Sequence, residues 1–277
     1  MLNGVRTTAL MAVMIVLFAL VGQAIAGSNG MMIAFVVAVG LNFASFWFSD
    51  KIVLKMYKAQ EVERTQAPEL YDMIDRLRTS AGLPMPKVYV IPSDQPNAFA
   101  TGRSPSHAAV AVTNGITRIL NKAELEGVIA HELAHIQNRD ILTSSVAATL
   151  AAAITLLARF AFFFGGDRRD NIVGSLMMMI LAPIAAVLIQ MAISRAREYA
   201  ADRDGAEICG KPGALASALG RLQEGAERMP MEANPSTAHM FIVNPFAGAL
   251  GGMRRLFSTH PPTEERIRRL RELEAGR

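Results

Sequence analysis

Two histidines and a glutamate form a compact cluster near the middle of the chain. Residues 131–135 read His131-Glu132-Leu133-Ala134-His135. On a helix, side chains four positions apart lie on one face, so the two imidazoles would lie side by side with Glu132 next to them. Neutral imidazole suits zinc, and a carboxylate beside the metal can take a proton from its water. The spacing predicts a hydrolytic zinc site; an exposed helix that carries two histidines by chance is the alternative.

A catalytic zinc ion needs a third protein ligand and must keep one position open for water. Glu198 and Asp202 are the candidates, because they lie four residues apart on a predicted helix. One could bind the metal while the other accepts a hydrogen bond from a ligand imidazole. Alternatively, both acids pair on a solvated face with the neighbouring arginines, which are Arg195, Arg197 and Arg203. Spacing alone leaves these two interpretations nearly even.

Long uncharged stretches predict that membrane-spanning helices position these residues. Half of the chain is apolar (51%), and its mean hydropathy is +0.27. Four runs of about twenty residues are each long enough to cross a hydrocarbon core of ~30 Å. They are Thr7–Ala26, Met31–Ser49, Ser144–Phe164 and Ile172–Ile193. The stretch Leu120–Asp140, which carries the motif, is polar, so we expect the histidines in water rather than in lipid.

The order of these runs would bring the histidines and Glu198 together. His131 and His135 precede the third run, and Glu198 follows the fourth. The connection Gly165–Asp170 is short, so the third and fourth runs would form a hairpin that returns the chain to the same side. Glu198 can then meet the histidines within ~15 Å of the membrane surface.

This organisation predicts four parts of the chain. Residues 1–50 form a two-span N-terminal membrane hairpin, and residues 51–143 form the first half of a metalloprotease domain with the motif helix. Residues 144–194 form a second membrane hairpin, and residues 195–277 form the second half of the domain with the third ligand.

Basic residues predict the orientation in the membrane. The loop Gly27–Gly30 carries no charge, and the charges of residues 167–170 balance. The opposite ends of the spans carry Arg6, Lys51, Lys55, Lys58, Arg139, Arg195, Arg197 and Arg203. By the positive-inside tendency, the site faces the cytoplasm. The net charge of +4 fits anionic headgroups better than nucleic acid, since no aromatic-basic recognition pattern accompanies it.

Four details of the apolar, charged and sulfur-containing residues qualify this interpretation. Ala24-Ile25-Ala26 resembles a signal-peptide cleavage site, but the long apolar run and the span that follows at once favour an uncleaved anchor. Arg159 interrupts the third run near its end, where its side chain can extend to the headgroups rather than act within the membrane. Cys209 is the single cysteine, so no intrachain disulfide can form, which fits a reducing cytoplasm. The run Met177-Met178-Met179 has no polar ligand beside it, so we interpret it as packing material rather than a copper site.

The soluble segment before the motif predicts a helix and a small antiparallel sheet. The helix begins at Pro68 and runs to Ser80, closed by Gly82. Three strands follow, namely Met85–Ser93, Asn97–Thr101 and Ala108–Thr113, the last two joined by the turn residues 102–105. Asn121 followed by Glu124 predicts a capping box at the start of the motif helix.

An edge strand beside the zinc would bind an extended peptide through main-chain hydrogen bonds. We assign this role to the exposed edge formed by Asn97, Ala98, Phe99, Ala100 and Thr101. That these residues are plain core is equally plausible for any single position.

The segment after the fourth run predicts two further helices. One covers Ala206–Arg228, and Thr263 caps the last, in which Glu264/Arg268 and Glu265/Arg269 form stabilising pairs. His260 stands just before this cap and could reach the water or the developing oxyanion, or only cap local structure. His107 and His239 have no partner pattern and are expected to be structural or exposed.

The chain resembles the HtpX-type heat-shock membrane proteases, which are relatives of the CAAX prenyl endopeptidases. The resemblance rests on four ordered motifs: residues 97–102 (Asn-Ala-Phe-Ala-Thr-Gly), the His131–His135 motif, residues 197–202 (Arg-Glu-Tyr-Ala-Ala-Asp) and residues 258–266 (Ser-Thr-His-Pro-Pro-Thr-Glu-Glu-Arg). It implies a gluzincin-type site, with His131, His135 and Glu198 as zinc ligands and Glu132 as catalytic base. It also implies protein quality control at the cytoplasmic (inner) membrane of bacteria.

Together, these patterns predict a mainly α membrane protein with four transmembrane helices and a cytoplasmic α+β zincin-like domain. We expect an endopeptidase with one zinc per chain that cleaves misfolded or damaged membrane proteins. Asp202 would orient a ligand histidine, and His260 or Tyr199 could donate to the oxyanion. The alternative is a membrane scaffold or chaperone whose zinc is closed by a fourth ligand, with Cys209 and His260 as the candidates. A transporter is disfavoured because the spans carry few polar residues.

Overall fold

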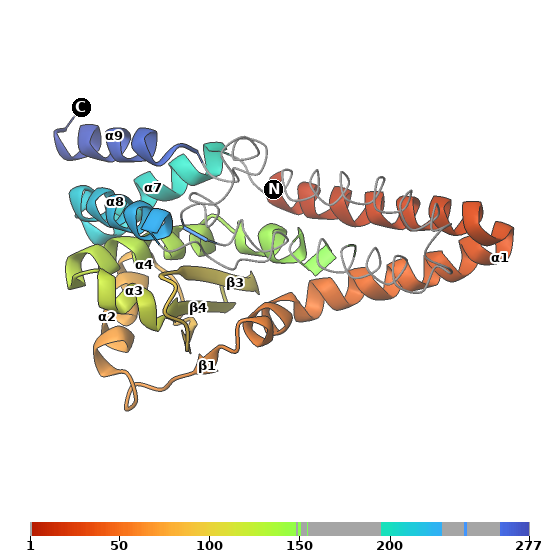
Figure 1. Ribbon diagram of the computed structural model, residues 1–277, viewed down its shortest axis with the longest axis horizontal. Coiled ribbons are helices and arrows are strands. Elements are labelled where there is room, and N and C mark those ends of the chain that lie inside the picture. The colour runs from red at the N-terminus through yellow and green to blue at the C-terminus, as the bar shows by residue number, and fades with distance from the viewer. Residues whose placement is uncertain are drawn as a thin grey trace.

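A computed structural model describes residues 2–147, 149–150, 154, 195–228, 241–242 and 261–276 (Figure 1). A long helical arm projects to one side of the molecule, and a layer of helices over a small sheet occupies the other. The connection 165–170, the fourth apolar run and most of the third lie outside the described residues. So do Arg159, Met177-Met178-Met179, His239 and His260.

The arm is α1 (Leu2–Met56), and it folds back on itself (Figure 1). The reversal is at Gly27, whose φ of +61° is a conformation that glycine adopts without steric cost. Asn42 Nδ2 donates to Met11 O at 2.9 Å although 31 residues separate them. A straight helix would place these residues about 45 Å apart, so the two limbs of α1 lie antiparallel.

The second limb has the dimensions of a membrane span. Within the described residues, Gly27–Met56 is long and apolar enough to cross a bilayer, and Thr7–Leu20 is a shorter apolar stretch. In the segment that begins at Ile141, Val146, Leu150 and Ile154 pack against both limbs of α1. Thr7 and Thr143 link the first limb to this segment by a hydrogen bond of 2.9 Å between their hydroxyls.

The sheet has four strands in the order β1-β2-β4-β3. They are β1 (Gln60–Glu61), β2 (Lys87–Ile91), β3 (Ala98–Ser104) and β4 (His107–Thr113). The prediction of a purely antiparallel sheet is wrong, because β2 pairs with β4 in parallel. The β3–β4 hairpin is antiparallel. The apolar run 108–112 is buried on both faces and therefore takes the central place, which leaves β3 at the edge.

The two faces of the sheet pack against different layers. Val88, Ala100 and Val110 face the helical layer that contains the motif. Phe99, Ala109 and Ala111 face the end of α1, where the Tyr57 ring lies 5.5 Å from the Phe99 ring. The sheet is thus held between the arm and the helices.

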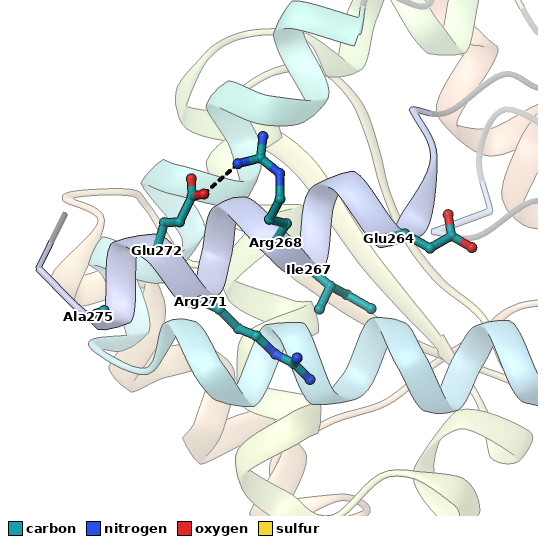
Figure 2. A pocket seen from close by; sticks show the side chains of 6 residues that line it. All are labelled: Glu264, Ile267, Arg268, Arg271, Glu272 and Ala275. Carbon is teal, nitrogen blue, oxygen red and sulfur yellow. Dashed lines mark hydrogen bonds and ion pairs between the residues drawn. The ribbon is translucent and has the colours of Figure 1, made fainter.

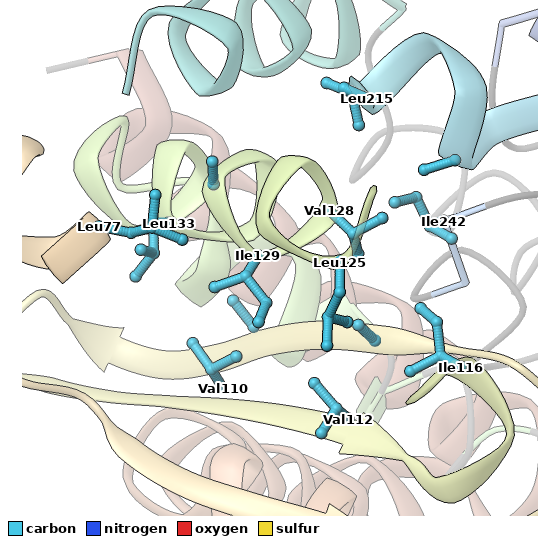
Figure 3. Packing of buried hydrophobic residues seen from close by; sticks show 14 of the residues in the cluster. Leu77, Val110, Val112, Ile116, Leu125, Val128, Ile129, Leu133, Leu215 and Ile242 are labelled. Atoms are coloured by element: carbon cyan, nitrogen blue, oxygen red, sulfur yellow. The ribbon is translucent and has the colours of Figure 1, made fainter. Parts of the chain in front are cut away.

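The helical layer begins with three helices. They are α2 (Pro68–Ser80), α3 (Asn114–Ile119) and α4 (Lys122–Gln137). The predicted helix 68–80 is confirmed, with Gly82 at φ +66° after its end. One face of α4 packs on the sheet through Leu125 and Ile129, as Figure 3 shows, while Leu215 lies on its other side.

The C-terminal half adds α7 (Arg195–Cys209), α8 (Pro212–Arg228) and α9 (Thr263–Glu274). The prediction of one helix over Ala206–Arg228 is wrong, because the chain breaks at Gly210 (φ +66°) and restarts at Pro212. The predicted Thr263 cap is also wrong: Pro262 is the capping residue, and the Thr263 hydroxyl donates instead to Gln223 at 3.1 Å. Glu265 pairs with Arg269 as predicted, at 2.7 Å, and Arg268 pairs with Glu265 and Glu272.

Candidate metal centre

Helix α4 presents the two histidines of the motif. It begins with the predicted capping box, in which Asn121 accepts from the Glu124 N–H while the Glu124 carboxylate accepts from the Asn121 N–H. This fixes the register of the helix. The helix is buried nearly throughout, and His131 is 1% exposed. The motif therefore lies inside the domain rather than on an exposed surface.

Helix α7 crosses α4 closely enough to bring its acids to the histidines. The crossing point is Gly205: a β-carbon there would lie 2.8 Å from the Cα of His131. Glu198 and Asp202 lie seven and three residues before Gly205 and share its helical face. Both are buried, at 7% and 4% exposed, so their interpretation as surface partners of nearby arginines is wrong.

Three side chains converge on one point. His131, His135 and Glu198 each offer one ligand atom, and these atoms all lie within 4.8 Å of one another. The two Nε2 atoms are 3.2 Å apart, and the Glu198 oxygens lie 3.6 Å from His135 Nε2 and 3.8 Å from His131 Nε2. Donors at ~2.0–2.1 Å from a tetrahedral zinc ion would be separated by ~3.3 Å, so this set fits zinc.

A carboxylate faces the far nitrogen of each ring. Asp202 Oδ1 lies 3.0 Å from His131 Nδ1, and Asp140 Oδ2 lies 3.2 Å from His135 Nδ1. Such partners favour the proton on Nδ1 and leave the Nε2 lone pair for a metal. The sequence analysis assigned no role to Asp140. The signal that could have found it is its place just after the end of α4, five residues from His135.

Arg266 closes the cluster from α9. It is 1% exposed, and it donates to both Asp202 oxygens, from Nε at 2.8 Å and from Nη2 at 2.7 Å. Its Nη1 donates to Ile242 O at 2.9 Å. Burial disfavours its charge, yet the Asp202 carboxylate raises the pKa of Arg266 above its ordinary value. Sequence reasoning gave Arg266 no role, although it stands in the last motif of the resemblance.

Glu132 lies beside the metal ligands and contacts the sheet edge. Its Oε2 accepts from the Ala100 N–H on β3 at 2.8 Å. Burial raises the pKa of the Glu132 carboxyl, against the lowering effect of the two imidazoles and of the Ala100 N–H. A raised pKa brings a carboxylate closer to the range in which a general base works at neutral pH.

Neighbouring charges shift the pKa values of the ionisable groups in the site. Burial lowers the pKa of His135, but its hydrogen bond to the Asp140 carboxylate and the charges of Glu198 and Glu132 outweigh burial and raise that pKa to about 9. Burial also opposes the ionisation of Asp202, but the charge and hydrogen bonds of Arg266 hold the pKa of Asp202 well below its usual range. Carboxylates thus surround the two imidazoles and favour a cation between them.

A small cleft of about 50 Å³ opens onto these groups. It is lined by Phe99, Ala100, His131, Glu132, His135, Asp140, Ile141, Ser144, Glu198, Phe241 and Ile242. A larger hollow of about 470 Å³ lies along α9 (Figure 2), lined by Glu264, Ile267, Arg268, Arg271, Glu272 and Ala275. No imidazole or thiol lines this hollow, and its Arg268 pairs with Glu272. The smaller cleft is therefore the candidate site.

The other predicted site residues are placed as follows. The strand Asn97–Thr101 lies at the sheet edge beside Glu132, but its five residues are buried, so the expectation that this edge is exposed is wrong. Tyr199 packs against Arg269, with the guanidinium 3.8 Å from the ring centre, and does not line the cleft. His107 is exposed and contacts the Ser104 and Ser106 hydroxyls. Cys209 lies eleven residues from Glu198 on α7, ~16 Å along the helix.

Known proteins match the part of the chain that contains these site residues. The model of Peptidase family M48 matches residues 64–274. The chain is 67% identical over 276 residues to a "Protease HtpX homolog" of Salinibacter ruber, covering 100% of this chain and 99% of the relative. It is 57% identical to a "Protease HtpX homolog" of Methylibium petroleiphilum, covering 98% and 97%.

A solved structure shares the fold. The chain superposes on S. mikatae Ste24p with a TM-score of 0.53 and 19% sequence identity. The match covers 92% of this chain and spans 62% of the length of Ste24p. At this identity, the likeness concerns the fold alone.

Proposed function

This chain belongs to peptidase family M48, and we propose that it is a membrane-bound zinc endopeptidase whose active site faces the cytoplasm. It is a metallopeptidase of the HtpX type, and the family implies a metal cofactor. The observation that carries the proposal is the convergence of His131, His135 and Glu198 beside Glu132.

Four membrane spans would hold the site at the cytoplasmic surface. The antiparallel limbs of α1 support a first hairpin, and their packing on Val146, Leu150 and Ile154 supports retention of the first limb in the mature protein. A second hairpin between residues 144 and 194 would return the chain to α7 on the same side. Lys51, Lys55 and Arg195 stand at that side, which favours a cytoplasmic site by the positive-inside tendency.

The ligands His131, His135 and Glu198 would hold one zinc ion per chain. A zinc ion bound there would lower the pKa of the attacking water and polarise the scissile carbonyl. Asp202 and Asp140 orient the two imidazoles, and Arg266 holds Asp202 in place. Each ligand histidine is thus oriented by a buried carboxylate.

Glu132 acts as the general base. It takes the proton of the attacking water and later delivers it to the leaving amine. Burial, which raises its pKa, strengthens the carboxylate as the acceptor of the water's proton. In the structure its carboxylate is held by the Ala100 N–H, so the base stands directly at the sheet edge.

The substrates would be misfolded or damaged membrane proteins, bound along β3 in an extended conformation. The strand Asn97–Thr101 lies at the sheet edge beside Glu132, and main-chain contacts with a substrate there would leave sequence preference loose. His260 could add a donor for the oxyanion. The proposed role in quality control at the bacterial inner membrane is what the resemblance to the HtpX-type proteases implies, and the relatives named "Protease HtpX homolog" support that resemblance.

The alternative, a zinc-stabilised scaffold without hydrolysis, needs a fourth protein ligand that closes the site. Within the part of the chain that the structure describes, the metal cluster has three members. Cys209 is too distant along α7 to be the fourth. Among the described residues the site therefore has three protein ligands and no fourth, and His260, the other candidate, lies outside them.

Metal analysis with a casein assay tests the proposal. Detergent-purified protein should hold about one zinc per chain and hydrolyse casein, lose both with a chelator, and regain both when zinc is added back. His135→Ala should lose zinc and activity, whereas the matched variant His107→Ala, at an exposed histidine, should keep both. Full zinc occupancy without any hydrolysis would favour the scaffold instead.

A further inference from the structure

Strand β3 connects the candidate active site to the arm. At Ala100 its N–H donates to the Glu132 carboxylate at 2.8 Å. At Arg103 the guanidinium stacks on the ring of Trp47 in α1, 4.8 Å from the ring centre. In Figure 1 the arrow of β3 points toward the arm. A single strand, with an irregular pairing between Gly102 and Ser104, thus reaches from Glu132 to the apolar helices.

Two independent features place the far end of β3 at the membrane surface. Phe43 and Trp47 are exposed on α1, and Lys51 and Lys55 follow within two turns, an order typical of the boundary between hydrocarbon and headgroups. On the other side of β3, the Thr101 hydroxyl lies 2.8 Å from the Ser145 hydroxyl, at the start of the third apolar run. Both contacts support a place for residues 101–104 at headgroup level.

The main chain of β3 is oriented to receive an extended segment. Asn97 O accepts from Thr113 N at 2.9 Å, so the odd-numbered residues pair with β4. The main-chain groups of Ala98 and Ala100 therefore face away from β4, as the bond from Ala100 to Glu132 shows. A peptide that adds to this edge would run between the membrane surface and Glu132.

We propose that β3 measures the distance of the scissile bond from the bilayer. The occupant would be the extended segment next to the span of a membrane-spanning polypeptide, cut about three to six residues from the membrane surface. Three residues separate Ala100 from Arg103, and an extended chain rises ~3.3 Å per residue, so the surface lies ~10 Å from the base. This inference rests on the proposed endopeptidase function. It adds that the protease selects the scissile bond by its distance from the membrane rather than by the sequence around it.

The placement of the hairpin tip can be measured without any hydrolysis. In a Cys209→Ser background, Ser106→Cys carries a spin label at the exposed β3–β4 turn, and the full chain is reconstituted in vesicles of phosphatidylethanolamine and phosphatidylglycerol. We expect this label within ~5 Å of the phosphate level, given the strand rise used above. A label at Thr117→Cys, exposed on α3 at the far end of the molecule (Figure 1), is the control and should lie well clear of the bilayer. Equal depths for the two labels would overturn the proposal.

A ladder of substrates tests the selection rule itself. Each substrate has one span followed by a uniform repeat of a short sequence, so that the same bond recurs at every distance from the membrane. Mass spectrometry of products in proteoliposomes should show cuts three to six residues from the span at least tenfold more often than cuts beyond fifteen. A spacer inserted between span and repeat should leave the cut at the same distance from the membrane.

The opposite results are distinguishable. Equal cleavage along the repeat, or equally rapid cleavage of the repeat when it is detached from its span, would overturn the distance rule while the endopeptidase function stands. If the zinc-loaded protein cleaves neither the ladder nor casein, the proposed function fails, and the distance rule fails with it.

Discussion

Gly205 and His131 meet where α7 crosses α4, and the contact leaves no room for a side chain. A β-carbon at position 205 would lie 2.8 Å from both the N and the Cα of His131, which are backbone atoms that cannot turn aside. Because Glu198 and Asp202 share the face of Gly205, this crossing distance also sets the distance between the two halves of the metal centre.

Gly205→Ala should therefore loosen the metal centre. We expect a loss of stability of about 1–3 kcal/mol from overpacking, together with weaker zinc binding, because the crossing must open. Thermal unfolding and zinc content measure the two effects. The matched control is Gly220→Ala, where the nearest atom, Ile267 Cδ1, would be 3.9 Å away. That helical substitution should stabilise slightly. Equal behaviour of the two variants would show that the crossing is not tight.

Glu132→Gln separates metal binding from hydrolysis. Glutamine has nearly the same shape and its carbonyl oxygen can still accept from the Ala100 N–H, but it cannot take a proton. Casein hydrolysis should fall by about 10²–10⁴-fold, while zinc content and unfolding temperature stay close to those of the wild type. Wild-type turnover in this variant would remove Glu132 from the role of base.

The parts of the site that the sequence predicts are those with local periodicity. His131 and His135, like Glu198 and Asp202, lie four residues apart, and the helix alone decides that such pairs share a face. Arg266 and Asp140 do not belong to such a pair. Arg266 reaches the site only because α9 packs across α7, a tertiary contact that no spacing encodes.

In the fold, too, features set by local sequence are predicted, whereas features set by tertiary contacts are not. The β3–β4 hairpin follows from local turn and strand signals, although β3 runs to Ser104, three residues beyond its predicted end at Thr101. The parallel pairing of β2 with β4 depends instead on which strand takes the buried centre. The break between α7 and α8 is a different case. Gly210 and Pro212 are local helix terminators, so this boundary was readable from the sequence.

Zinc affinity should rise with pH. In the metal-free protein the pKa of His135 is about 9, above its ordinary value, so the ring carries a proton at pH 7 that zinc must displace. One displaced proton predicts an apparent affinity that rises about tenfold per pH unit between pH 6 and 8 and levels off near pH 9. Competition with a chelator at several pH values measures this slope, after correction for the chelator's own protonation.

Asp140→Asn provides the matched variant for this pH dependence. The amide keeps the shape of Asp140 but removes the charge that holds the proton on His135, so the slope between pH 6 and 8 should become shallower. At high pH the variant should bind zinc about 10–100-fold more weakly, because the ring loses its orienting carboxylate. A slope identical to that of the wild type would mean that Asp140 does not control the protonation of His135.

Arg266 should be needed for the stability of the whole C-terminal half. Arg266→Met leaves the buried Asp202 carboxylate without its cation, and an uncompensated buried charge costs about 3–5 kcal/mol. Adding Asp202→Asn removes that charge, so the double variant should unfold at a higher temperature than the single one. Arg268→Ala, which removes an exposed arginine on the same helix, should leave the unfolding temperature unchanged. If the Met variant unfolds like the wild type, or the double variant recovers nothing, the pair does not hold α9 against α7.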